Sequence, residues 1–410
     1  MMAKDRIVVG LEVGTSKVCA VVGEVVDGGN ISIIGVGQVA SEGVRKGEIV
    51  NMEAATQNIH DALIQAEESA DVEIRNVYAS VTGGHLRCFN NRGSVAVTNE
   101  DREITEDEVR NVMLNAKAVN IPMDHVVLHA IRQRFYVDGA DGIQTPLGMM
   151  GAKLEADVHV IHGVKTRLQN TIRCIKQVPL DVANIAVSSL ASALAVLTPE
   201  HRQLGAVVID MGGGTTDYIV YRDGTIQHTG VIAVGGDHIT NDIATGLKIP
   251  MNRADALKIE HGSLELLDVD ETINLKREVG LADREVSKQQ LCRVMNLRVE
   301  ETLNFIKQDI DKNKLTDYLG AGVFITGGCA RLRGMERLAT NIFGLPVNIG
   351  HSHTVSGPTA TIESPEYSTT IGLIRYAQGS QRDHHNAPTS IERVSQTVRG
   401  YFLKIRALLM

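Results

Sequence analysis

The chain has 410 residues, a formal net charge of −8, and ordinary proportions of hydrophobic (43%) and charged (22%) residues. This length predicts two domains or lobes, and the composition is typical of a soluble globular protein. The acidic balance argues against nucleic acid as the main partner, because binding to a phosphate backbone needs a basic surface. Five scattered cysteines without C-x-x-C spacing favour a reducing cytosol and argue against a structural zinc site. The sequence also predicts no secretion signal and no membrane-spanning helix.

The N-terminal part alternates between apolar runs and turn residues, and one helical pattern follows them. The predicted strands lie at residues 7–11, 18–25, 31–39 and 77–82, and the predicted helix at 52–69. The next segment differs, because it combines alternating strands with a charged helix that Thr105 caps and that ends near Asn120. We therefore expect an inserted α+β subdomain at residues 86–162.

The second half repeats the opening of the chain. Strands predicted at residues 205–211, 217–222 and 225–234 follow the order of the first three, which indicates an internal repeat at the level of fold. The segment at 250–318 then becomes helical and highly charged, and we interpret it as a second insertion. Its expected apolar stripe consists of Val294, Leu297, Leu303 and Ile306.

Two glycine-rich loops of the same kind carry the strongest functional signal. Each follows an apolar strand, has a carboxylate where that strand ends (Glu12 and Asp210), and leads into another strand. A glycine turn lets backbone N–H groups surround an anion, and Thr or Ser hydroxyls add donors. The candidate phosphate-binding residues are Gly14, Thr15, Ser16 and Lys17 in the first loop and Gly212, Gly213, Gly214, Thr215 and Thr216 in the second.

The two carboxylates are positioned to hold a magnesium ion through water, as phosphate-bound magnesium usually requires. Either loop alone is equally compatible with a simple hairpin turn, but the matched pair favours one phosphate chain held from both sides. A third motif, Thr326-Gly327-Gly328, again follows an apolar strand and precedes a helix. Glycine there permits close approach of a flat ligand, although a sterically forced turn is the alternative.

The order of these motifs resembles that of the actin-like ATPase superfamily, with connecting and final helices at 188–197 and 368–376. Within the superfamily the chain resembles the FtsA family of bacterial cell-division proteins over about residues 5–376 and the tail. The segments that carry this resemblance lie at 9–18, 34–37, 146–149, 208–217 and 367–373.

The resemblance implies an α/β, actin-like two-lobed fold with duplicated ribonuclease-H-like subdomains. The first lobe would comprise residues 1–85, 163–204 and 368–377 and carry the inserted subdomain at 86–162. The second lobe would comprise residues 205–250 and 319–367, with the helical insertion at 251–318. ATP and Mg²⁺ would bind in the cleft between the lobes.

Two departures from the superfamily pattern bear on hydrolysis. Chaperone and MreB relatives place a Glu, which helps to orient the attacking water, where this chain has Ser188, and a serine is no general base without an activating partner. Actin has aspartate where this chain has Glu12. We therefore expect tight nucleotide binding with slow or negligible hydrolysis, and we assign no catalytic residue. Lys258 resembles the superfamily lysine beside the adenosine, but a solvated surface lysine fits the sequence equally well.

The C-terminal tail differs from the rest of the chain. Residues 378–390 are polar and predict a flexible linker. Residues 391–410 predict an amphipathic helix with flanking basic residues, which suits an anionic membrane surface, although docking on the body of the protein is the alternative. The residues expected at the membrane are Val394, Val398, Arg399, Phe402, Lys404, Ile405, Arg406 and Leu409.

The FtsA resemblance implies a polymerising protein that anchors FtsZ filaments to the inner face of the cytoplasmic membrane at the division septum. The FtsZ C-terminal tail would dock at residues 298–307, with Arg298 as a contact for the acidic peptide, unless this is an ordinary solvated helix face. The subdomain at 86–162 would recruit later septal membrane proteins. Two other classes stay open, namely another actin-like scaffold of the pilus-assembly or MreB type and a small-molecule kinase.

Overall fold

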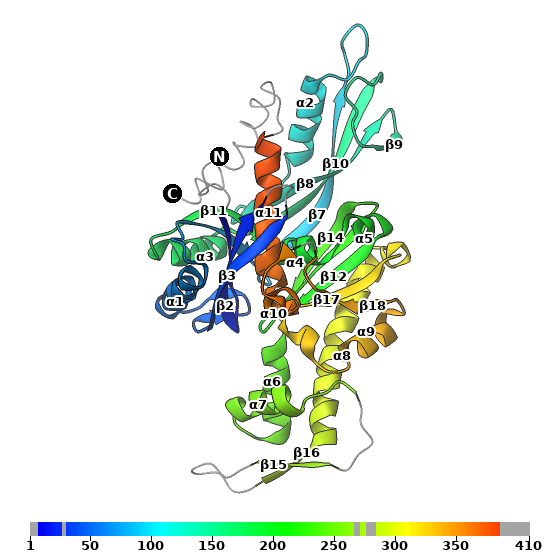
Figure 1. Cartoon of the computed structure of the whole chain (residues 1–410). Coiled ribbons are helices and arrows are strands. Elements are labelled where there is room, and N and C mark those ends of the chain that lie inside the picture. Colours follow the sequence, from blue (N-terminus) through cyan, green and yellow to red (C-terminus); the bar gives the residue numbers. More distant parts are fainter. Residues whose placement is uncertain (1–6, 27–29, 266–270, 276–283, 354, 386–410) are drawn as a thin grey trace.

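The computed structural model of the chain describes residues 7–26, 30–265, 271–275, 284–353 and 355–385. It has two lobes, each built on one mixed sheet, with an inserted subdomain on the first and a helical insertion on the second (Figure 1). Within those ranges, no helix combines the length and the apolarity needed to cross a membrane. The amphipathic helix expected at 391–410, with all of its membrane-facing residues, lies outside the described residues.

The first-lobe sheet has six strands in the order β11-β6-β1-β2-β3-β19. Its N-terminal meander is antiparallel, and β6 and β11 extend it in parallel on one side. These strands are β1 (Ile7–Val13), β2 (Lys17–Val25), β3 (Ile31–Ala40), β6 (Asn76–Val81), β11 (Asp181–Val187) and β19 (Val355–Ser356). The short strands β4 (Val44–Arg45) and β5 (Glu48–Ile49) pair only with each other.

The second-lobe sheet repeats this plan with five strands in the order β14-β13-β12-β17-β18. An antiparallel meander is again extended on one side by two parallel strands, so the observed topology agrees with the expected internal repeat. The strands are β12 (Ala206–Met211), β13 (Thr216–Arg222), β14 (Thr225–Ile232), β17 (Gly322–Thr326) and β18 (Val347–Ile349).

Two helices pack against each other between the sheets and connect the lobes (Figure 1). Helix α4 (Ser188–Val196) contacts β12 and β13, whereas α11 (Ser368–His385) contacts β1, β2 and β6. Their contact is close, since a Cβ on Gly372 would lie 1.8 Å from the Ala191 carbonyl oxygen. Helix α1 (Met52–Ala70) covers the opposite face of the first sheet and packs on α3 (Lys165–Gln177).

Helix α11 corrects one expectation from the sequence. The linker predicted at 378–390 is helical up to His385, because α11 continues past its buried half. Ala377 and Gln378 are still buried, and extending a formed helix costs much less free energy than starting one. Composition alone therefore placed the end of this helix too early.

The inserted subdomain is a four-stranded antiparallel sheet in the order β7-β10-β8-β9, covered by one helix. Thr105 and Glu108 form a reciprocal capping box at the start of that helix, as the acidic first turn suggests. The helix ends at Lys117, before the expected Asn120. The elements are β7 (Arg87–Ala96), α2 (Glu106–Lys117), β8 (His125–Val137), β9 (Ala140–Ile143) and β10 (Lys153–Val164).

The insertion in the second lobe is less purely helical than expected, because the hairpin of β15 (Thr272–Leu275) and β16 (Arg284–Ser287) precedes its longest helix, α8 (Lys288–Lys312). Leu303 and Ile306 are fully buried on α8, but Leu297 is 55% exposed, so its assignment to the apolar stripe was wrong. The buried face follows residues 291, 295, 299 and 303, two positions away from Leu297. The remaining helices are α5 (Pro199–Leu204), α6 (Gly236–Leu247), α7 (Met251–His261), α9 (Met335–Phe343) and α10 (Thr359–Ile362).

Candidate nucleotide-binding cleft

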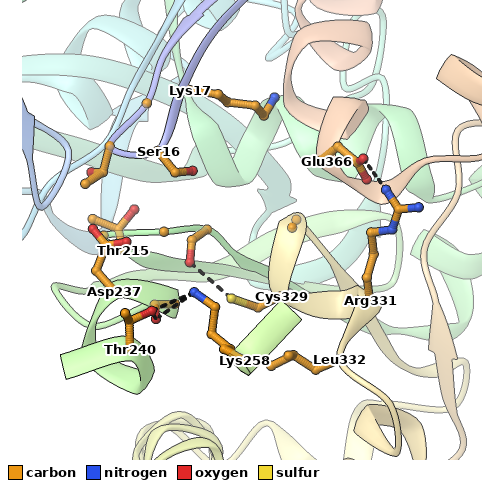
Figure 2. A pocket seen from close by; sticks show the side chains of 18 of the residues that line it. Ser16, Lys17, Thr215, Asp237, Thr240, Lys258, Cys329, Arg331, Leu332 and Glu366 are labelled. Atoms are coloured by element: carbon orange, nitrogen blue, oxygen red, sulfur yellow. Dashed lines mark hydrogen bonds and ion pairs between the residues drawn. The ribbon is translucent and has the colours of Figure 1, made fainter. Parts of the chain in front are cut away.

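A cavity of about 1070 Å³ opens between the lobes, where the β1–β2 and β12–β13 turns face each other. Figure 2 shows Lys17 and Ser16 of the first turn at the top and upper left of it, with Thr215 of the second turn just below Ser16. Residues of all three glycine motifs thus share one cavity. The predicted residues that line it are Glu12, Gly14, Thr15, Ser16, Lys17, Asp210, Gly212, Gly213, Gly214, Thr215, Lys258, Gly327 and Gly328.

The two turns have the same backbone hydrogen bond. Gly14 N–H donates to the Lys17 carbonyl at 3.0 Å, and Gly212 N–H donates to the Thr215 carbonyl at 2.9 Å. Each turn joins two antiparallel strands whose apolar residues are buried, so the local sequence fixes its position. The same turn therefore occurs in both lobes, and the two copies line one cavity.

The turns approach so closely that a side chain at Gly213 or Gly214 of the second turn would collide with the first turn. A Cβ on Gly213 would lie 2.9 Å from the Ser16 Cβ, and a Cβ on Gly214 would lie 2.3 Å from the Thr15 hydroxyl oxygen. A side chain at either position would therefore require Thr15 or Ser16 to move. The glycines thus serve the contact between the lobes as well as the exposure of backbone donors.

Thr216 does not line the cavity, in contrast to the expectation from the sequence. It is fully buried, and its hydroxyl donates to the Val234 carbonyl at 2.8 Å. Successive side chains of a strand point to opposite faces, and Thr215 and Asp217 face the cavity. Asp217 is the functional candidate that the motif offered and that sequence reasoning passed over.

Asp210 is held by two hydroxyls that the sequence did not reveal. Its Oδ2 accepts hydrogen bonds from Ser192 of α4 and, at 2.7 Å, from Thr369 of α11. Burial raises the pKa of Asp210, and the charge of Glu12 raises it further, while the two hydroxyls oppose this shift. The helices between the sheets therefore fix this carboxylate from the first lobe.

Asp217 connects the lobes directly. The Thr82 hydroxyl, at the end of β6, lies 2.6 and 2.8 Å from its two carboxylate oxygens. Burial raises the pKa of Asp217 to about 7, and the charges of Asp210 and Glu12 contribute. Three carboxylates thus stand around the same part of the cleft.

Lys17 is paired with Glu12, since the Lys17 Nζ lies 3.0 Å from Glu12 Oε2. Burial alone would lower the pKa of Lys17, but the charge and hydrogen bond of Glu12, together with Cys19 and Tyr367, outweigh burial and raise this pKa. The described residues contain no group of three or more Cys, His, Asp or Glu side chains arranged to hold a metal ion. A magnesium ion beside Glu12 and Asp210 would therefore take most of its ligands from water and phosphate, as this cation prefers.

The far side of the cavity is formed by the third motif and by α7. Gly327 has φ 83°, and a Cβ there would lie 2.4 Å from Asp210 Oδ1, whereas a Cβ on Gly328 would meet nothing within 4 Å. Lys258 is only 14% exposed and its Nζ lies 2.7 Å from the Thr240 hydroxyl. Lys258 is thus part of the cavity wall, and its interpretation as a solvated surface lysine was wrong.

Ser188 and Arg298, which the sequence also singled out, both have partners within the protein. Ser188 is buried at the start of α4, lines the cavity, and donates to the Val81 carbonyl at 3.3 Å. Arg298 forms ion pairs with Asp242 and Glu301, so its charge is already met by acids of the second lobe.

Comparison with protein families identifies two segments. Residues 207–372 match the family model "Cell division protein FtsA", and residues 83–162 match "SHS2 domain inserted in FTSA". The chain is 36% identical over 412 residues to Cell division protein FtsA of Pseudomonas aeruginosa, covering 97% of this chain and 98% of that relative. It is 35% identical over 418 residues to the Escherichia coli protein of the same name, with coverages of 99% and 98%.

Solved structures show the same architecture at low sequence identity. The PilM-PilN type IV pilus biogenesis complex is similar with a TM-score of 0.65 and 15% identity, over 90% of this chain and 98% of that chain. MreB5 of Spiroplasma citri bound to ADP is similar with a TM-score of 0.58 and 16% identity, over 94% and 100%. These similarities confirm the actin-like fold. Together with the two family models and the full-length identity to the curated relatives, they show that this chain belongs to the FtsA family of actin-like cell-division proteins.

Proposed function

We propose that the protein binds ATP with magnesium in the cleft between its lobes. The observation that carries this proposal is the pair of matched glycine turns, which approach each other closely and together line a cavity of about 1070 Å³. Phosphates would accept from the backbone N–H groups of these turns, and the base would lie beside Gly328, where the wall leaves open space. MreB5 of Spiroplasma citri, which has the same fold, was solved bound to ADP and to AMPPNP.

Magnesium would lie beside Glu12 and Asp210 and reach them through water. Burial raises the pKa of both aspartates, and repulsion among Glu12, Asp210 and Asp217 adds to this rise; the positive charge of magnesium would offset that repulsion. We therefore expect nucleotide and metal to bind much more tightly together than either does alone.

Calorimetry of Mg·ATP binding tests this proposal. Asp210→Ala should abolish measurable binding, because it removes the carboxylate that Ser192 and Thr369 orient toward the cleft. Glu68→Gln, an exposed change of equal charge on α1, is the matched control and should bind as the wild type does. Equal affinity of the Asp210 variant and this control would remove Asp210 from the site.

Nucleotide hydrolysis would be slow. Ser188 occupies the position from which related ATPases supply a carboxylate, and its hydroxyl is engaged with the Val81 carbonyl. Bound ATP would then act mainly as a structural ligand that holds the two lobes together and supports head-to-tail filaments.

The protein would anchor FtsZ filaments at the inner face of the cytoplasmic membrane, at the septum. The basic amphipathic pattern at 391–410 supports the membrane contact, and a single such helix binds reversibly, so polymerisation would strengthen it by avidity. Flotation with anionic vesicles tests this step. The full chain should float and carry FtsZ with it, whereas a chain ending at residue 390 should bind FtsZ without floating.

The FtsZ tail would dock on α8. Leu297 and Phe305 are 55% and 52% exposed there and offer apolar contacts, and an acidic peptide would compete with Asp242 and Glu301 for Arg298. Arg298→Ala should weaken binding of a labelled FtsZ tail peptide in an anisotropy titration. An unchanged dissociation constant would exclude Arg298 as a contact. The inserted subdomain at 86–162 would recruit later septal proteins.

A further inference from the structure

A second cavity, of about 490 Å³, lies at the other end of the helices that connect the lobes. Helix α4 presents Ser188 to the nucleotide cleft and Leu194 to this second cavity, and α11 holds Asp210 through Thr369 and lines the second cavity with Arg375. The end of α2, helix α5 and strands β8 and β11 also line it, and β13 and β14 contribute from the second lobe. The cavity therefore lies where the first lobe, the inserted subdomain and the second lobe meet.

Its lining is strongly cationic. Lys117, Arg132, Arg202 and Arg375 come from four different elements, and none of the described lining residues is Asp or Glu. Arg132 donates to the Gln144 carbonyl at 3.1 Å and lies over the Phe135 ring, and Arg202 donates to the Leu197 carbonyl at 3.4 Å. The Nε atom of Arg202 is buried and has no hydrogen-bond partner among the described residues. A buried guanidinium N–H without an acceptor costs free energy that a ligand oxygen would recover.

Burial disfavours the charged form of two of these cations. Burial lowers the pKa of Arg375, and the neighbouring positive charge of Arg202 lowers it further. Burial likewise lowers the pKa of Lys117. A bound anion would relieve both effects, because it supplies the opposite charge beside these partly buried cations.

The rest of the wall indicates the size and character of the occupant. Leu128, Ile131, Leu190 and Leu194 give it an apolar side, and Tyr376 lies beside Asn184. The volume lies within the range of about 300–1,000 Å³ that is usual for small-ligand sites. The tail of this chain at 391–410 is basic and is therefore a poor match for the cavity by charge.

We propose that this cavity binds a compact polyanion, a small molecule that carries two or more phosphate or carboxylate charges. Arg202 and Arg132 provide guanidinium donors for these groups, since planar guanidinium matches both phosphate and carboxylate oxygens. The site is separate from the nucleotide cleft, and its occupancy does not depend on whether ATP binds there.

The test is a calorimetric titration of the full chain with pyrophosphate and, separately, with citrate, in the absence of nucleotide and Mg²⁺. Without magnesium the carboxylate-lined cleft repels both anions, so the second cavity is the expected site. We expect one saturable site, weakened about tenfold or more by Arg202→Gln and by Arg132→Gln. Arg173→Gln, an exposed arginine of α3, is the control and should bind as the wild type does. The ratio of the two affinities distinguishes a phosphate ligand from a carboxylate ligand.

A second measurement does not rely on the variants folding. The anion should slow acetylation of Lys117 by an N-hydroxysuccinimide ester, measured by mass spectrometry, and leave the exposed Lys165 unaffected. Absence of saturable binding together with unprotected Lys117, or equal binding by the Arg202, Arg132 and Arg173 variants, would overturn the proposal. Binding of an oligoglutamate peptide with no binding of either small anion would overturn it in favour of a protein partner.

Discussion

Asp217→Asn should stabilise the nucleotide-free protein at neutral to alkaline pH, although Asp217 lies in the proposed nucleotide site. Asparagine resembles the protonated carboxyl group in shape and can keep the hydrogen bond from Thr82, which lies 2.6 Å from Oδ1. It removes the buried negative charge that burial and the neighbouring carboxylates oppose. The predicted gain therefore depends on the ionisation of Asp217.

The pKa fixes the sign and the size of this effect. Because the folded-state pKa of Asp217 is raised from 3.8 to about 7, the folded state binds the proton more tightly than the unfolded state does. Ionised Asp217 therefore lowers the free energy of unfolding progressively between about pH 4 and 7. With about 1.4 kcal/mol for each unit of pKa, the full loss is about 4 kcal/mol above pH 7. The variant should match the wild type near pH 4 and exceed it by up to about 4 kcal/mol at pH 8.

Urea unfolding followed by far-ultraviolet circular dichroism at pH 5 and pH 8 measures this difference, and the chain has no tryptophan to serve as a fluorescent probe. Glu68→Gln removes the same charge from an exposed position and should shift neither midpoint. If Asp217→Asn is no more stable than Glu68→Gln at pH 8, the carboxylate is not under strain and the reasoning fails.

Three other predictions concern packing, pH and hydrolysis. Gly372→Ala should lower stability by about 1–3 kcal/mol in thermal melts, because its Cβ would lie 1.8 Å from a carbonyl oxygen of α4, whereas Gly379→Ala on the same helix meets nothing within 4 Å and should be harmless. Burial would lower the pKa of His228, but its interactions with Asp309 and Cys88 together outweigh burial and raise the pKa to about 9. The stability of this pair is therefore fully present below pH 6.5 and lost as pH rises through about 9, and Asp309→Asn should flatten that alkaline loss of about 1–2 kcal/mol in urea titrations. Ser188→Glu should raise the rate of phosphate release from ATP, and an unchanged rate would show that a missing carboxylate is not what limits hydrolysis.

The sequence predicted local features well, because they depend on neighbouring residues. Both glycine turns, the capped helix at Thr105 and the repeated meander follow from strand periodicity and turn chemistry. It could not show that Ser192 and Thr369 hold Asp210, since these residues belong to separate segments that only the packing of α4 against α11 brings together. Neither Ser192 nor Thr369 belongs to a sequence motif that would identify it as a partner of Asp210.

Other errors have equally specific physical causes. Thr216 belongs to the glycine motif but faces away from the cavity, because side chains alternate along β13. Leu297 is apolar and suggested a buried stripe, yet the face that α8 buries is set by its neighbours in the second lobe. The partners of Arg298 are Glu301 on its own helix and Asp242 on α6, and no sequence pattern predicts the contact with Asp242.

The route of the chain through the first lobe has a consequence for biosynthesis. Strand β19 and helix α11, at residues 355–385, complete the edge and cover one face of a sheet whose other strands come from residues 7–187. During translation, the apolar face formed by Val8, Val21 and Ile33 stays uncovered until Ile371 and Ile374 emerge from the ribosome and pack against it. The first lobe is therefore begun first and finished last, after the whole second lobe has been synthesised. Contacts of such long sequence separation slow folding and leave hydrophobic surface exposed for longer. We therefore expect the nascent chain to depend on chaperones until α11 docks.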